Sequence, residues 1–216
     1  MSSGPFFFRI LMLLLTKSLA SSDSLCYCST TPCPVLGINT ILIGNNTTAT
    51  YVYIQNVDSF PVISSAFVTL TAADLDLGGV TSACTSAYAR AMEDDGLSNV
   101  DAGHILAHRL GGPGADATNI FPQVMHTNRG SFAQFEGNIY DCLSPSSSDD
   151  PADSVALAWK FKYNDTASTQ PHMVTYTSKY SGGSCVGSEV EFANTHYDEP
   201  QKLVKSLWGR EDQHVR

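Results

Sequence analysis

Hydrophobic and polar residues alternate along several short stretches of the chain, and such alternation predicts β-strands with one buried face. Residues 50–55 (TYVYIQ) and 66–71 (AFVTLT) alternate in this way and are rich in β-branched and aromatic residues. Three more strand-like runs, separated by turn residues, follow at 155–164, 172–180 and 189–194. Consecutive strands of this kind favour an antiparallel sheet.

Two other stretches show helical spacing. Residues 81–92 (TSACTSAYARAM) combine this spacing with good helix formers, and from Met125 onward the apolar residues define one face of a helix. Between them lie a strand-compatible run at 101–108, a turn-rich segment at 110–119 and a short strand at 119–123. The order strand, loop, strand, helix is therefore embedded in a larger sheet. The chain has 216 residues and no internal repeat, which predicts a single α+β domain.

The N-terminal apolar run, residues 5–20, predicts export from the cell. Arg9 and Lys17 interrupt the run, so its uninterrupted part is too short to span a bilayer. Small residues at Ser18 and Ala20 suit a signal peptidase, and we expect a signal peptide at 1–20 and a mature, secreted domain at 21–216. The alternative is an uncleaved anchor or a buried N-terminal helix. No later segment is apolar enough to cross a membrane.

An even number of cysteines agrees with an oxidising compartment. Six cysteines suit up to three disulfides, with fifteen possible pairings. Zinc binding is the alternative, but the six are scattered and form no C-x2-C pair. Glycosylation sequons occur at Asn45 or Asn46 and at Asn164. The cysteines are Cys26, Cys28, Cys33, Cys84, Cys142 and Cys185.

The charge of the chain limits how it could hold nucleic acid. Removing the signal segment, which carries Arg9 and Lys17, takes the formal net charge from −9 to −11. Binding through charge alone needs clustered lysine and arginine, so any nucleic-acid contact should be local and transient. The C-terminal segment 202–216 is modestly basic and could be a partner surface or a solvated helix face.

The central stretch, residues 101–138, concentrates polar residues around a short apolar run. It contains D-A-G-H at 101–104, R-L-G-G at 109–112, N-I-F-P-Q at 119–123, N-R-G at 128–130 and a downstream Glu136. In this order the motifs resemble the DNA/RNA non-specific endonucleases, whose core is the ββα-metal, or His-Me, finger. The resemblance implies a ββα core at about 100–143, packed on a mostly antiparallel sheet in one disulfide-stapled domain.

The chemistry of phosphodiester hydrolysis gives roles to three of these residues. A neutral imidazole takes a proton from water near neutral pH, so we assign His104 as general base, as the resemblance also implies. Mg²⁺ prefers oxygen ligands and keeps several waters, so the Asn128 amide oxygen could be its one direct protein ligand, with Mn²⁺ as a substitute. Glu136 would orient a water in the shell of the cation. Eight residues along a helix leave about 80° of rotation, so Glu136 should share a side with Asn128.

Other residues of the motifs could support the site. We expect Asn119 to belong to the catalytic set as a supporting polar residue, and Arg109 or Arg129 to contact the phosphate. Many members of the family carry arginine where this chain has Ala102, which removes one candidate phosphate contact.

Each assignment has a structural alternative. His104 could be a buried structural histidine, and together with His108 it forms an H-x3-H spacing that would suit zinc on a helix. Asn128 could only cap a helix, Glu136 could be a solvated helix residue, and Arg109 could form a structural ion pair.

The leading hypothesis is a secreted, Mg²⁺-dependent, sugar-non-specific endonuclease. By resemblance it would cut DNA, with RNA as a possible second substrate, and leave 5′-phosphate ends. One alternative is a catalytically silent module of the same fold that binds nucleic acid or protein. Another is a glycosylated structural protein, which accounts for the cysteines and sequons but not for the central motifs.

Overall fold

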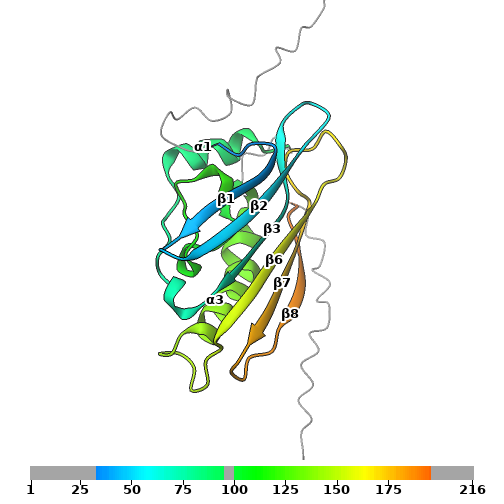
Figure 1. Ribbon diagram of the computed structural model, residues 1–216. Coiled ribbons are helices and arrows are strands. Elements are labelled where there is room, and N and C mark those ends of the chain that lie inside the picture. The colour runs from blue at the N-terminus through cyan, green and yellow to red at the C-terminus, as the bar shows by residue number, and fades with distance from the viewer. Residues whose placement is uncertain (1–32, 95–99, 196–216) are drawn as a thin grey trace, which may run out of the picture.

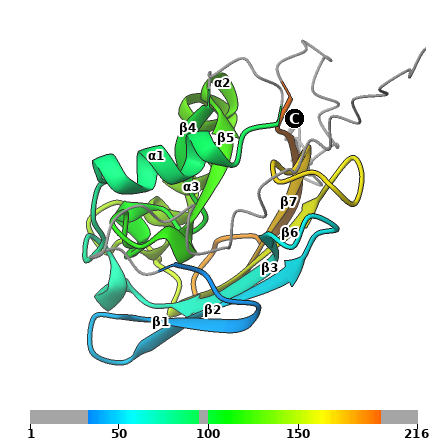
Figure 2. The same cartoon turned by 90° about the horizontal axis from the view of Figure 1, so that it is seen from above.

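The computed structural model describes residues 33–94 and 100–195 as two layers, a sheet and a helical layer. Figure 2 shows the sheet along one side, with the helices and the β4–β5 hairpin on the other. The sheet has six strands in the order β1-β2-β3-β6-β7-β8, and all neighbours are antiparallel (Figure 1). Its strands are β1 (Gly37–Ile43), β2 (Thr47–Gln55), β3 (Pro61–Leu70), β6 (Ser154–Lys162), β7 (Met173–Ser181) and β8 (Ser188–Ala193).

The second layer holds the ββα unit that the central motifs predicted. β4 pairs antiparallel with β5, and a helical segment in three parts follows directly. α1 packs beside β4. The elements are α1 (Ala83–Ala91), β4 (Val100–His104), β5 (Ile120–Val124), α2 (Met125–Thr127), the π-helical turn η5 (Asn128–Phe132) and α3 (Ala133–Leu143), with short 3-10 turns η2 (Ala72–Asp74), η3 (His108–Leu110) and η4 (Ala117–Asn119).

The α+β class, the antiparallel sheet and the strand positions expected from the sequence are confirmed. The helix expected at 81–92 is α1, and the helical face after Met125 is buried as expected. β1 was not expected: it is an edge strand in which Ile38 and Leu42 remain exposed, so its pattern carries no clear buried face. The signal peptide, Cys26, Cys28 and the basic C-terminal segment lie outside the described residues.

An aromatic core joins the two layers. Phe132 lies 5.4 Å from Tyr176 and 5.0 Å from Phe192, ring centre to ring centre, so the start of α3 is anchored on β7 and β8. Trp159 and Tyr176, on neighbouring strands of the sheet, are both fully buried, with ring centres 4.6 Å apart. Burying one such ring contributes on the order of 2–3 kcal/mol, so the Phe132 contacts fix the helix that carries the site against the sheet.

Disulfides hold the periphery of the domain. Cys142 at the end of α3 is bonded to Cys185 in the loop between β7 and β8. Cys33 and Cys84 each take part in a disulfide as well. Within the described ranges, no helix is long and apolar enough to cross a membrane, and no three His, Cys, Asp or Glu side chains are grouped as metal ligands would be.

Candidate active site

His104 ends β4, where the strand leaves the hairpin. Its Nε2 lies 3.0 Å from the carbonyl oxygen of Gly79, in the loop before α1. A carbonyl only accepts hydrogen bonds, so in the neutral ring Nε2 carries the proton and Nδ1 is left as the basic nitrogen. The fold thereby selects the tautomer that a general base needs.

The surroundings of His104 also favour its neutral form. Burial lowers the pKa of His104, the hydrogen bond to the Gly79 carbonyl raises it in part, and the nearby His108 lowers it again, with a net shift below the usual 6.5. The two rings lie 6.0 Å apart, centre to centre. Near pH 7 the ring is therefore uncharged and ready to accept a proton.

Asp101 holds the two residues that begin the helical segment. Asn128 Nδ2 donates to Asp101 Oδ2 at 3.0 Å, while Arg129 donates to both carboxylate oxygens at 2.8 Å. Burial alone would raise the pKa of Asp101, but the hydrogen bonds from Arg129 and Asn128 outweigh it and the pKa is lowered. An ionised carboxylate only accepts hydrogen bonds, so Asp101 must face the Nδ2 of Asn128 and thereby fixes the orientation of the amide. The Oδ1 of Asn128 is then left to accept from, or to bind, another group.

These side chains line one open cavity of about 350 Å³ between α1, β4 and the start of the helical segment. His104, Asn128, Arg129 and Asp101 are on its wall, together with Arg90 from α1. The site therefore brings the expected base and the expected metal ligand to the same space.

The donor set of this cavity fits a hard cation that keeps most of its waters. One amide oxygen, Asn128 Oδ1, faces no competing hydrogen bond within the described residues. Mg²⁺ is commonly held by few protein groups together with water and phosphate oxygens. Zinc would need several nitrogen or sulfur ligands, and the residues described here offer no such group.

The place of Glu136 relative to Asn128 does not follow from regular helical spacing. Gly130 has non-helical backbone angles (φ −109°, ψ −111°) within the π-helical turn, so the rotation from Asn128 to Glu136 is not that of a regular helix. Glu136 does not line the cavity, so its expected action on a water of the cation shell stays a prediction. Its Oε1 is buried without a hydrogen-bond partner, and burial raises the pKa of Glu136 well above its usual value.

Asn119 is a structural residue, which corrects the expectation that it belongs to the catalytic set. The side chain is fully buried and lies off the cavity wall. Its Oδ1 accepts from the Tyr51 hydroxyl and the Leu106 N–H at 2.9 Å, and its Nδ2 donates to the carbonyls of Leu106 at 2.9 Å and Pro113 at 3.2 Å. Its hydrogen-bonding groups close the loop between β4 and β5 and tie that loop to Tyr51 of β2.

Glycines allow this loop to fold tightly over Asn119. Gly111 has φ +97°, and a Cβ there would also meet Ile43 at 2.6 Å. Gly112 passes so close to the Leu106 carbonyl that no side chain fits. The two glycines of the R-L-G-G motif are thus needed for loop closure whatever the chemistry.

The two predicted phosphate-binding arginines are both engaged within the protein. Arg109 lies with its guanidinium 3.8 Å from the centre of the Tyr140 ring on α3 and does not line the cavity, which corrects its expected place in the site. Arg129 does line the cavity, but its guanidinium is paired with Asp101. Neither position was evident from the sequence, because both depend on contacts between distant elements.

Sequence reasoning gave no role to three groups that the structure brings to the site. Gly79 orients His104, Asp101 orients Asn128, and Arg90 reaches the cavity from α1. Asp101 could have been suspected, since it opens the D-x-G-H motif. Nothing local marks Gly79 or Arg90.

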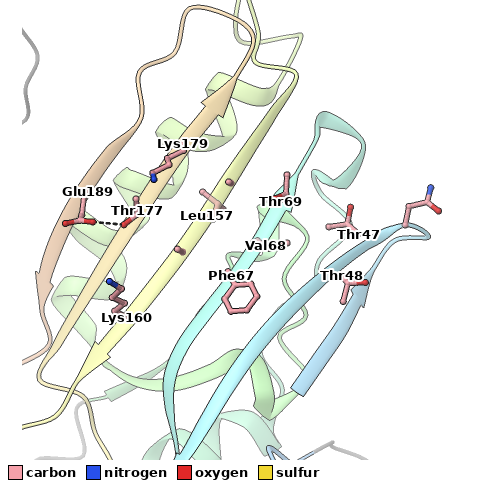
Figure 3. Close-up of a pocket in the computed structure, with 13 residues that line it drawn as sticks. Thr47, Thr48, Phe67, Val68, Thr69, Leu157, Lys160, Thr177, Lys179 and Glu189 are labelled. Atoms are coloured by element: carbon pink, nitrogen blue, oxygen red, sulfur yellow. Dashed lines mark hydrogen bonds between the residues drawn. The ribbon is translucent and has the colours of Figure 1, made fainter. Parts of the chain in front are cut away.

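A larger cavity of about 680 Å³ lies on the outer face of the sheet, away from this chemistry. Figure 3 shows its side chains, including Phe67, Lys160 and Lys179, standing on the side of the sheet turned away from the helices. The cavity contains no histidine and no motif residue, so we do not assign the active site there.

Comparison with known proteins agrees with the motifs. The model of the family described as DNA/RNA non-specific endonuclease matches residues 47–182. "Probable deoxyribonuclease RhsA" from Dickeya dadantii (strain 3937) is 34% identical over 125 residues, which cover 58% of this chain and 8% of that much longer protein.

Two crystal structures of NucA from Streptococcus agalactiae are also similar to this chain. The one with no metal bound matches with a TM-score of 0.46 and 12% identity, covering 73% of this chain and 83% of its own. The one with magnesium ion bound matches with a TM-score of 0.49 and 14% identity, covering 77% and 84%. Because the family model matches more than half of the chain, we conclude that this chain belongs to the DNA/RNA non-specific endonuclease family.

Proposed function

We propose that this chain is a secreted, Mg²⁺-dependent endonuclease that hydrolyses phosphodiester bonds of DNA, with RNA as a second substrate, and leaves 5′-phosphate ends. The observation that carries the proposal is the meeting of His104, from the end of β4, and Asn128, from the start of the helical segment, on one cavity. Family membership supports the reaction class, and the resemblance of the motifs supports the 5′-phosphate product. The N-terminal apolar run and the even cysteine count support secretion.

His104 acts on the attacking water. Its Nδ1 is the free basic nitrogen, since Nε2 is held by the Gly79 carbonyl at 3.0 Å. A proton moves from water to Nδ1 as the oxygen attacks the phosphorus, and the lowered pKa of His104 keeps the acceptor nitrogen unprotonated at neutral pH. Such general-base help is worth about 10²–10⁴-fold in rate.

Asn128 is the residue that would hold the cation, through the Oδ1 that its hydrogen bond to Asp101 leaves open. Mg²⁺, or Mn²⁺ in its place, would neutralise charge on the phosphoryl oxygens and stabilise the leaving oxygen. Asp101 keeps the amide oriented before substrate arrives, so little reorganisation remains for the reacting complex.

A plasmid-nicking assay tests the proposal. The mature protein should convert supercoiled plasmid to open circles and fragments with Mg²⁺ or Mn²⁺, and EDTA should stop it. His104→Ala should fold normally and cut about 10²–10⁴-fold more slowly. No cutting by the folded wild-type protein under any of these conditions would favour the silent module instead.

The finer parts of the proposal have their own measurements. Fragments with 5′-phosphates should be joined by a DNA ligase without prior kinase treatment, and a 5′-hydroxyl product would contradict the assignment. A labelled RNA of the same sequence tests the second substrate. N-terminal sequencing of protein recovered from the medium should begin near residue 21 if the signal is cleaved as expected.

A further inference from the structure

One cation on the cavity wall has no role in the chemistry described above. Arg90 belongs to α1, and Ser86 lies one turn before it on the same face, so both side chains line the cavity beside Thr81. α1 packs against β4 (Figure 2), and this face of the helix shares the cavity with His104 at the end of β4. The helix is fixed there by the buried Tyr88 and Ala89.

Arg90 differs from the other two described arginines in having no ion-pair partner among residues 33–94 and 100–195. Arg129 is bound to Asp101 by two hydrogen bonds, and Arg109 covers the Tyr140 ring. In residues 33–94 and 100–195 the ion pairs are Arg129–Asp101 and Lys162–Glu191, so no carboxylate there neutralises Arg90. The adjoining wall, at Ala102, contributes no charge. Arg90 is therefore the cavity cation whose guanidinium remains available to an external anion.

A guanidinium beside a hydroxyl suits a phosphodiester oxygen pair, because its fork matches the geometry of the phosphate. We propose that Arg90, assisted by Ser86, binds a backbone phosphate of the nucleic-acid substrate next to the scissile one. This inference rests on the proposed function and adds a substrate-positioning subsite to it.

The neighbouring phosphate is favoured over the scissile one for a physical reason. Transition-state stabilisation needs donors that are held in place before the reaction. Arg90 is exposed, and no hydrogen bond within the described residues holds its side chain. A contact of this kind is made equally in the ground state and the transition state, so its loss should raise KM and leave kcat unchanged.

The test compares Arg90→Ala, Arg90→Lys and Lys179→Ala with wild type on a short fluorescent DNA duplex. Lys179→Ala is the matched control, because it removes the same charge from the opposite face of the sheet (Figure 3). Arg90→Ala should raise KM about tenfold with unchanged kcat, the usual size of one charged hydrogen bond. The slope of log(kcat/KM) against log[salt] should become shallower by about one. Arg90→Lys should retain the salt slope, and Lys179→Ala should behave as wild type.

Binding of the same duplex in EDTA, followed by fluorescence anisotropy, separates this inference from the proposed function. Arg90→Ala should weaken the Kd about tenfold even where nothing is cut. An unchanged Kd and KM, or an equal loss in Lys179→Ala, would overturn the subsite, whether or not the wild-type protein is active. A fall in kcat at constant KM would overturn the neighbouring-phosphate assignment. An inactive wild type that loses binding on Arg90→Ala would defeat only the proposed hydrolysis.

Discussion

Asn119→Ala should destabilise the fold and leave the chemistry of the folded protein intact. The substitution removes the partner of four groups: the Tyr51 hydroxyl, the Leu106 N–H, and the carbonyls of Leu106 and Pro113. Asn119 is fully buried, so water cannot replace these partners without opening the loop. A buried polar group left unsatisfied costs at least about 1 kcal/mol, so the four together cost about 4 kcal/mol.

That cost is a large share of the total stability of a domain, which is about 5–15 kcal/mol. For a domain of this size it lowers the Tm by about 10 °C. Urea unfolding followed by far-UV circular dichroism, with the disulfides intact, measures the change in free energy of unfolding. Nicking assays at a temperature where the variant is fully folded then report kcat separately.

Two matched substitutions sharpen the measurement. Tyr51→Phe removes one of the four hydrogen bonds and should cost about 1 kcal/mol. Asn128→Ala is the same chemical change at the cavity wall. It should remove most activity with little loss of stability, because among the described residues the Asn128 side chain makes one hydrogen bond, to the partly buried Asp101. Wild-type stability in Asn119→Ala, with or without loss of kcat, would refute the structural role argued from the buried network.

Three further predictions concern the ionisable and metal-binding groups. The acid limb of the pH profile of kcat/KM should lie below pH 6.5, because burial and His108 lower the pKa of His104 and only the neutral ring accepts the proton. An acid limb at or above pH 6.5 would contradict the assignment of His104 as the base. Raising Mg²⁺ should recover much of the loss in Glu136→Ala and little of the loss in Asn128→Ala. On the expected assignment Glu136 would act on the cation through a water, worth about 10–100-fold, whereas Asn128 would be its direct ligand; equal recovery would refute this division. Burial raises the pKa of Glu136, so as the pH rises above 4.5 the Glu136 carboxyl loses its proton in the unfolded chain before it does so in the folded protein. The free energy of unfolding of the metal-free protein should therefore fall as the pH rises towards the raised pKa. Glu136→Gln should flatten that fall in urea titrations at a series of pH values, and identical pH dependence in both proteins would show that the carboxyl is not buried in solution.

Local patterns in the chain were sufficient to predict most of the strands and helices, though not β1, and to predict the reaction class. Alternation at 50–55, 66–71 and the three later runs reports strands with one buried face, and that local pattern survives into β2, β3, β6, β7 and β8. The ordered motifs around His104 and Asn128 identified the ββα unit, because the spacing of a strand, a loop and a helix is itself local information.

Tertiary structure decided what each polar residue does. Asn119 and Asn128 are the same side chain in neighbouring motifs, yet one is enclosed by Tyr51 and Leu106 from distant parts of the fold and the other faces a cavity. The backbone at Gly130 departs from helical angles, so a regular helical period does not give the direction of Glu136 relative to Asn128. Arg90 entered the site only because α1 packs on β4. Periodicity records which face of an element is buried, whereas the partner that buries it is set by how distant elements pack.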